Sequence, residues 1–233
     1  MTKVLFVLTS ANKLLNDKPT GWYLPECAHP YYVFKEAGYE VEFASPAGGE
    51  APLDPGSAEA FKEDPECKKF NADPEAQNAV KTTQVLSKVD DAAYAAVFYV
   101  GGHGPCFDLA VDPVSIALAE KVFASGRVLS AVCHGPAAFH KVKGPDGKSI
   151  FAGRKATCFS NEEEEQVGLT KAIPFLVETD IKENGGTYVH ERQAWGEEVT
   201  VDKTGGLTLI CGANPASATA TAHAIIKELK ASA

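Results

Sequence analysis

The sequence contains no Cys-x-x-Cys pair, no apolar run long enough for a membrane and no excess of basic residues. Its most apolar stretch, Ala92 to Val100, is about half of the roughly 20 residues that a membrane-spanning helix needs. The chain carries 22 Lys and Arg against 31 Asp and Glu, which gives a net charge of −9. Nucleic acids and anionic membranes attract basic surfaces, so we expect neither as a partner.

The cysteines lack the spacing of a zinc site, and they stand at positions 27, 67, 106, 133, 158 and 211. We therefore expect no zinc centre. The N-terminus does not have the pattern of a signal peptide, because Lys3 precedes only a short apolar segment that ends at Ser10. We expect a cytoplasmic protein with reduced thiols, and the nucleus is an alternative location.

Apolar, strand-like segments alternate with helical segments along the chain. Strands are predicted at 3–8, 39–45, 95–100, 127–132 and 155–159, and three short strands near positions 188, 199 and 209 are expected to pack together. Helices are predicted at 25–37, 113–125, around 136, 175–183 and from 214 onward. This alternation predicts one α/β domain over residues 1–233, with a mostly parallel sheet covered by helices on both faces.

One segment, about 48–91, interrupts the alternation. It is rich in Pro, Asp, Glu and Lys, and it contains one helical pattern over 74–88. We interpret this segment as an insertion that packs beside the sheet.

Cys133 stands where a buried strand meets the start of a helix, in the sequence RVLSAVCHGPAAF at 127–139. This is the pattern of a nucleophile elbow, a sharp turn that lifts one side chain above the sheet. We expect an exposed thiol whose pKa is lowered by the N-terminus of the following helix. His134 would either orient the thiol or supply only its backbone N–H to an oxyanion.

A second strand end carries the sequence GGHGPCFD at 101–108. Gly102 lets the backbone approach a ligand, so its N–H is a candidate second oxyanion donor. His103 is a candidate substrate-binding residue, although a loop imidazole more often bonds to backbone. Cys106 is a rival nucleophile, but it lies several residues past the strand and lacks the elbow.

Two acidic features have both an ordinary and a functional interpretation. Glu26 lies in the first turn of the first predicted helix, where acids commonly interact with the helix dipole. The run Glu162 to Glu165 follows Ser160-Asn161, either of which would cap a helix, and its acids are expected to be solvated.

Together these motifs resemble the ThiJ/PfpI superfamily: AVCHGP, GGHGxxFD, ExxHP, FSNxxE and a late GxNPxS. Within it the sequence is most similar to the fungal branch of glyoxalase III and heat-shock-protein-31-like proteins. The resemblance implies a flavodoxin-like doubly wound fold with a lid-like insertion, and a homodimer. It implies Cys133 as nucleophile beside His134, and Glu26 as an active-site acid. It also implies Glu164 as the acidic partner of His134, with Glu163 as the alternative.

The implied reaction converts methylglyoxal, a small dicarbonyl, to lactate without glutathione, a metal or another cofactor. Cys133 would form a hemithioacetal, and Glu26 or His134 would move a proton between the two carbonyl carbons. The same resemblance leaves a chaperone for misfolded proteins and a deglycase for glycated proteins as alternatives. A glutamine amidotransferase would need a late His-x-Glu pair, and His190-Glu191 has the wrong spacing.

Overall fold

The structure, a computed structural model, describes residues 2–190 and 193–231. Its main sheet has seven strands in the order β3-β2-β1-β4-β5-β9-β8, and all neighbours pair in parallel except β8 and β9. The strands are β1 (Lys3–Val7), β2 (Glu40–Ser45), β3 (Gln84–Val85), β4 (Ala96–Tyr99), β5 (Val128–Val132), β8 (Val199–Asp202) and β9 (Leu209–Gly212).

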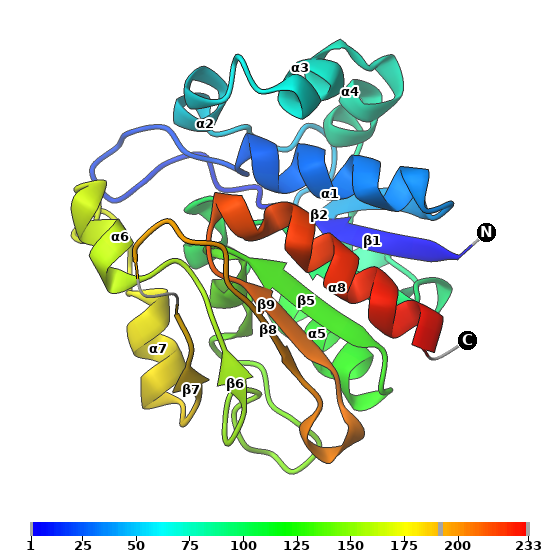
Figure 1. The fold of residues 1–233 in the computed structure, drawn as a ribbon, viewed down its shortest axis with the longest axis vertical. Helices are drawn as coiled ribbons and strands as arrows, with labels where there is room; N and C mark the ends of the chain where they lie inside the picture. Colours follow the sequence, from blue (N-terminus) through cyan, green and yellow to red (C-terminus); the bar gives the residue numbers. More distant parts are fainter. Residues whose placement is uncertain (1, 191–192, 232–233) are drawn as a thin grey trace.

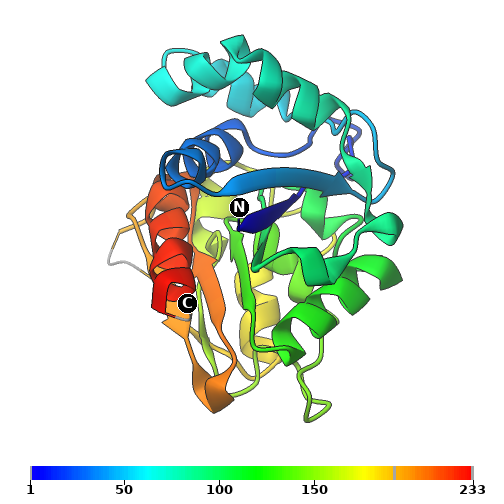
Figure 2. The same ribbon diagram turned by 90° about the vertical axis from the view of Figure 1, so that its right-hand side faces the viewer.

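Helices cover both faces of this sheet, which confirms the predicted doubly wound, flavodoxin-like α/β fold (Figures 1 and 2). One face carries α1 (Leu24–Glu36) and α8 (Ala218–Ala231), and the other carries α5 (Pro113–Ala124). The central strands β1, β4, β5 and β9 are almost entirely buried, as their continuous apolar sequences predict.

The insertion is more helical than predicted, and its helices lie over α1 (Figure 1), while other parts of it also contact β2 at the edge of the sheet. It forms three short helices, α2 (Pro55–Ala60), α3 (Pro65–Ala72) and α4 (Pro74–Lys81). Each begins with an Asp-Pro pair, in which the aspartate accepts backbone N–H groups of the first turn. The predicted helix over 74–88 was wrong beyond Lys81, because residues 84–85 instead form β3 at the edge of the main sheet.

The late strands are also arranged differently from the prediction. Two of them, β8 and β9, pair antiparallel at the far edge of the main sheet. The third, β7 (Thr187–Tyr188), pairs with β6 (Lys155–Ala156) in a separate two-stranded sheet. Between these two strands lie α6 (Asn161–Gln166) and α7 (Val177–Glu183). Among the residues that the structure describes, no helix is long and apolar enough to cross a bilayer.

Candidate active site

The candidate site lies at the carboxyl ends of β1, β4 and β5, where the strand order reverses. Because the connections from β1 and β4 run to opposite faces of the sheet, a crevice opens at this point of the fold. The start of α1 contributes Glu26, the loop after β4 contributes Gly102, and the turn after β5 contributes Cys133. The topology therefore gathers two strand-end candidates, Cys133 and Gly102, and the acid implied by the resemblance, Glu26, at one edge of the sheet.

Cys133 occupies a tight turn with a backbone conformation that is rare for a side-chain-bearing residue. Its φ is 58°, its N–H donates to the carbonyl of Gly212 at 2.9 Å, and its carbonyl accepts the N–H of Phe159 at 3.0 Å. Fixed from both sides, the residue is held in the left-handed region. This geometry fits the predicted nucleophile elbow.

Two expectations about this thiol were wrong. The helix that follows is a 3₁₀-helix, η4 (Gly135–Phe139), too short for a large dipole. The side chain of Cys133 is 3% exposed rather than open to solvent. Burial raises its pKa, the adjacent carboxyl of Glu26 raises it further, and the N–H of Gly102 acts in the opposite direction. The resting thiol therefore keeps its proton more tightly than an ordinary cysteine does.

Glu26 is fully buried, so it is not the solvated first-turn acid of the ordinary interpretation. Burial raises the pKa of its carboxyl well above the usual range, while the thiol of Cys133 and the N–H of Gly101 lower it by smaller amounts. Neither carboxyl oxygen of Glu26 makes a well-aligned hydrogen bond. A Cβ at Gly101 would lie 2.3 Å from Oε2, so only glycine fits beside this carboxyl. Burial therefore favours the protonated form of this acid beside the sulfur.

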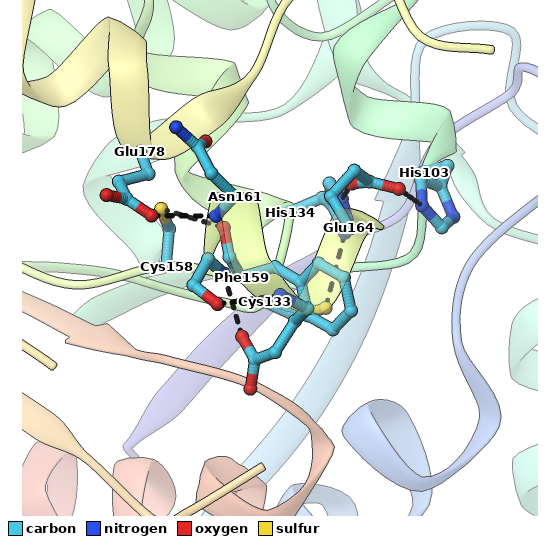
Figure 3. Close-up of polar contacts among 10 residues, drawn as sticks. His103, Cys133, His134, Cys158, Phe159, Asn161, Glu164 and Glu178 are labelled. Atoms are coloured by element: carbon cyan, nitrogen blue, oxygen red, sulfur yellow. Dashed lines mark hydrogen bonds and ion pairs between the residues drawn. The ribbon is translucent and has the colours of Figure 1, made fainter. Parts of the chain in front are cut away.

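His134 links the thiol to Glu164, and Figure 3 shows this carboxylate between two imidazoles. Nδ1 of His134 lies 3.3 Å from Sγ of Cys133, and Nε2 lies 2.5 Å from Oε2 of Glu164. His103 places its Nε2 2.9 Å from the other carboxylate oxygen. If both imidazoles donate from Nε2, Nδ1 of His134 keeps its lone pair toward the thiol.

The electrostatics of this group favour a neutral His134 and an ionised Glu164. Burial and then the neighbouring His103 lower the pKa of His134 by more than Glu164 raises it. Burial alone would raise the pKa of Glu164, but both histidines outweigh it and hold that pKa well below its usual range. A neutral imidazole beside a thiol is equipped to accept its proton.

Glu164, and not Glu163, contacts His134. The side chain of Glu163 forms a capping box with Ser160 at the start of α6. Its Oε1 also accepts Nδ2 of Asn214 at 2.9 Å and the N–H of Trp195 at 2.8 Å. The expectation of a solvated acidic run was wrong for Glu163 and Glu164, which are 3% and 2% exposed. The Ser-x-x-Glu spacing of a capping box was the sequence feature that could have separated the two.

Three aromatic or polar residues of the site were not predicted. Phe159 packs on the ring of His134 with centroids 4.7 Å apart, and Trp195 meets Phe159 at 5.4 Å. Asn214, expected only to open the last helix, joins Glu163 to the carbonyl of Gly196. Nothing in the local sequence links these positions, because the fold alone brings them together.

The rival interpretations find little support in the geometry. Cys106 is 1% exposed, packs in the core on the α5 side of the sheet, and has its pKa raised by burial. His103 bonds to a carboxylate rather than to backbone. Of the amidotransferase pair His190-Glu191, Glu191 lies outside the described residues.

Two clusters of the described residues have metal-ligating atoms close together: His103, His134 and Glu164, and His29, Asp64 and Cys67. In the first, each imidazole has a carboxylate oxygen as its partner, so a metal ion would have to displace both protons. In the second, Asp64 caps α3 and bonds to His29 at 2.9 Å. Both groups have hydrogen-bonding partners that account for their positions.

Comparison with known proteins agrees with this arrangement. Glyoxalase 3 of Candida albicans is 32% identical over 97% of this chain and 98% of its own. The glutathione-independent glyoxalase hsp3101 of Schizosaccharomyces pombe is 33% identical over 89% of this chain and 87% of its own. The crystal structure of glyoxalase III from Candida albicans superposes with a TM-score of 0.88 at 31% identity, over 97% of this chain and 96% of that one.

The family model described as the DJ-1/PfpI family matches residues 20–228, a range that contains every candidate residue of the site. This match confirms the ThiJ/PfpI resemblance carried by the elbow, the glycine loop and the late Asn-Pro motif. The chain belongs to the DJ-1/PfpI family.

Proposed function

We propose that the protein is a glutathione-independent glyoxalase that converts methylglyoxal to lactate with Cys133 as its nucleophile. The observation that carries this proposal is the buried contact of a thiol with both a carboxyl and an imidazole, from Glu26 and His134. The reaction needs a nucleophile for the aldehyde and groups that carry protons between neighbouring carbons. The names of the fungal relatives support the same reaction.

The first step is addition of sulfur to the aldehyde. The Cys133 thiol passes its proton to Nδ1 of His134, and the carboxylate of Glu164 stabilises the imidazolium that forms. A carbon–sulfur bond forms while the aldehyde C=O becomes an alkoxide. That oxygen takes the proton of Glu26, which gives a hemithioacetal and leaves the Glu26 carboxylate beside the C–H bond that the aldehyde carbon retains. The N–H of Gly102 is the candidate donor to the oxygen during this change.

The second step moves a proton between carbons. The Glu26 carboxylate removes the C–H proton, which gives an enediolate, and returns it to the former ketone carbon. The remaining hydroxyl proton moves to the neighbouring oxygen, so a thioester of lactate is formed. The aldehyde carbon is oxidised and the ketone carbon is reduced within one molecule, and no external oxidant or reductant is required.

The last step is hydrolysis. Water attacks the thioester, the carbon–sulfur bond breaks, and lactate leaves as a carboxylate with release of one proton. The thiol of Cys133 and the carboxyl of Glu26 are then protonated again, so the site returns to its resting state.

Incubation of the pure protein with methylglyoxal, without glutathione, tests the proposal through chiral lactate analysis. We expect one lactate enantiomer in excess from the wild type and none above background from Cys133→Ser. Cys106→Ala is the matched thiol control and should keep its activity. Racemic lactate at the rate of the blank would refute the proposal, and activity in Cys133→Ser would refute the role of the thiol.

The chaperone and deglycase alternatives have no specific support in the described structure. The large exposed hydrophobic residues come from separate segments: Leu15, Val111, Val167, Trp195 and Val201. A deglycase would use the same thiol, and glycated peptides offered in the lactate assay would compete with methylglyoxal if they were substrates.

A further inference from the structure

Three successive residues of the loop after β4, residues 101–103, each contact a different group of the candidate site. A Cβ at Gly101 would lie 2.3 Å from Oε2 of Glu26 and 2.9 Å from Cβ of Cys133, so the backbone touches both side chains. Burial raises the pKa of Cys133, and the N–H of the second residue opposes this rise. Nε2 of the third residue lies 2.9 Å from Oε1 of Glu164. The position of this segment therefore determines how the thiol and the two carboxyl groups are supported.

The far end of this loop is tied to the loop after β1 by the carboxylate of Asp108. Its Oδ1 accepts the hydroxyl hydrogen of Thr9 at 2.8 Å and the backbone N–H of Leu109 at 2.7 Å. Its Oδ2 accepts the backbone N–H groups of Ser10 at 2.6 Å and Ala11 at 3.1 Å. Because β1 and β4 are neighbouring parallel strands, this carboxylate joins two loops at the edge of the sheet where the site lies.

Thr9 connects this tie to the segment at 101–103. It is fully buried, and its side chain packs against Gly104, the residue that directly follows the segment. A Cβ at Gly104 would lie 2.3 Å from Cγ2 of Thr9 and 2.6 Å from its Oγ1. This glycine opens the 3₁₀ turn η3 (Gly104–Cys106), which ends two residues before Asp108. The side chain of Thr9 is therefore held between the start of the turn and the carboxylate beyond its end.

The chemistry of the tie requires a carboxylate. Two N–H or O–H groups point at each oxygen of Asp108, which uses the roughly four lone-pair sites of an ionised carboxyl group. An asparagine of the same shape would replace one acceptor oxygen by an NH₂ donor. One of the two loops would then lose its acceptor and face another donor in its place.

From this geometry we propose that Asp108 is a positioning residue, which fixes residues 101–103 against the thiol and the two carboxyl groups of the site. Asp108 acts through Thr9 and the loop backbone. A displacement of about 1 Å caused outside a site can lower turnover by about 10²-fold, so such a tie matters for catalysis. The effect on turnover rests on the proposed function, whereas the effect on the Cys133 thiol does not.

Alkylation of Cys133 by iodoacetamide, followed over pH by peptide mass spectrometry, tests the positioning without an assay of turnover. In Asp108→Asn the N–H of Gly102 should lose its alignment with the sulfur, so the pKa of Cys133 should rise further. We expect the midpoint of the profile to move to higher pH and the labelling rate near neutral pH to fall about three-fold or more. Burial already favours the protonated form of Glu26, so a weaker contact with Gly101 changes its charge little.

Two substitutions of Thr9 and one control variant accompany this measurement. Thr9→Val removes the hydroxyl bond with little change in volume and should shift the profile in the same direction, whereas Thr9→Ser keeps the hydroxyl and should stay close to the wild type. Asp202 also accepts two backbone N–H groups, those of Lys155 and Thr204, both at 2.9 Å. It lies at the opposite edge of the sheet, so Asp202→Asn should lower Tm without moving the profile.

The outcomes separate a positioning role from a purely structural one. A lower Tm in Asp108→Asn and Thr9→Val with an unchanged midpoint of alkylation would overturn the inference. A lower labelling rate at all pH values with an unchanged midpoint would show restricted access to the thiol and would also overturn it. If Asp108→Asn does not fold, Thr9→Val decides by the same criterion.

Lactate assays on the same proteins distinguish this inference from the proposed function. Turnover of methylglyoxal by Asp108→Asn should fall about ten-fold or more, mainly in kcat. A shifted alkylation profile in a protein whose wild type makes no lactate would refute the glyoxalase but keep the positioning role of Asp108. Normal turnover in Asp108→Asn together with an unchanged profile would refute the positioning role and keep the glyoxalase.

Discussion

The carboxyl of Glu26 faces the thiol of Cys133 in a fully buried space, and linked reasons favour the protonated form of each group. Burial penalises the charged form of each group, and a charge on Glu26 further raises the pKa of Cys133. Two negative charges are therefore disfavoured, and the pair titrates as a unit. The site stores the protons that the proposed reaction needs.

Glu26→Gln separates proton transfer from thiol chemistry. The amide keeps the shape of the side chain but cannot carry a proton, so turnover of methylglyoxal should fall by about 10²-fold or more. Without the carboxyl, the pKa of Cys133 should fall, and the pH profile of its alkylation by iodoacetamide should shift to lower pH. Peptide mass spectrometry gives the site and rate of labelling. Near-normal turnover would return Glu26 to a structural role.

Glu26→Gln should also be more stable than the wild type, and the difference in stability between the two proteins should grow as pH rises. The folded pKa of Glu26 lies above its unfolded value of about 4.3, so the folded state binds more protons between these values. The free energy of unfolding of the wild type therefore decreases as pH rises through that window. Glu26→Gln lacks this loss, and its Tm advantage over the wild type should be larger at pH 8 than at pH 4. An advantage independent of pH would contradict the raised pKa.

Neighbouring glutamates should differ in their effect on turnover when each is changed to glutamine. Glu164→Gln removes the carboxylate that stabilises protonated His134, so turnover should fall by about 10²-fold. Its Tm should fall as well at neutral pH, because both histidines lower the pKa of this carboxylate in the folded state and the ionised form therefore stabilises the fold. Glu163→Gln disturbs the cap of α6 and the contacts with Asn214 and Trp195, so its main effect should be on Tm. Thermal melts and lactate assays on both variants check the pair. Equal losses of turnover without loss of stability would contradict this division.

Asp64 should matter for the attachment of the insertion. It caps α3 by accepting the N–H of Cys67 at 2.8 Å and bonds to His29 of α1 at 2.9 Å. Asp64→Ala should cost about 1–2 kcal/mol of unfolding free energy, which urea denaturation measures. Asp90→Ala, which removes the cap of an isolated 3₁₀ turn, is the control and should cost less. Equal losses of unfolding free energy in the two variants would mean that the hydrogen bond between Asp64 and His29 does not contribute to stability.

The sequence predicted the central fold well, because its strands are buried on both faces and are therefore continuously apolar. The positions of Gly102 and Cys133 were predictable for the same reason, since each follows a recognisable strand in a fold that gathers such ends. A site role for Glu26 came only from the family resemblance, because its place in the first turn of a helix favoured a solvated acid. The edges were less predictable. The strand at 84–85 is too short for a pattern, and α4 ends where the chain turns to pair with β2.

What could not be predicted was the burial around the thiol. The run Glu162 to Glu165 was predicted to be solvated. The contacts that bury Glu163 and Glu164 come from residues distant in sequence, namely Asn214, Trp195 and His134. The pKa of Cys133 was predicted in the wrong direction for a similar reason. Its neighbourhood in the sequence suggested a helix dipole, whereas its neighbourhood in space includes a buried acid.

The backbone at position 133 also bears on how the protein can change over generations. Glycine and asparagine accept a φ of 58° more readily than cysteine does. After gene duplication, a copy that is no longer selected for turnover should therefore become more stable when Cys133 is replaced by glycine or asparagine. The rest of the chain need not change. A family member with glycine at this position should therefore be well folded but catalytically inactive.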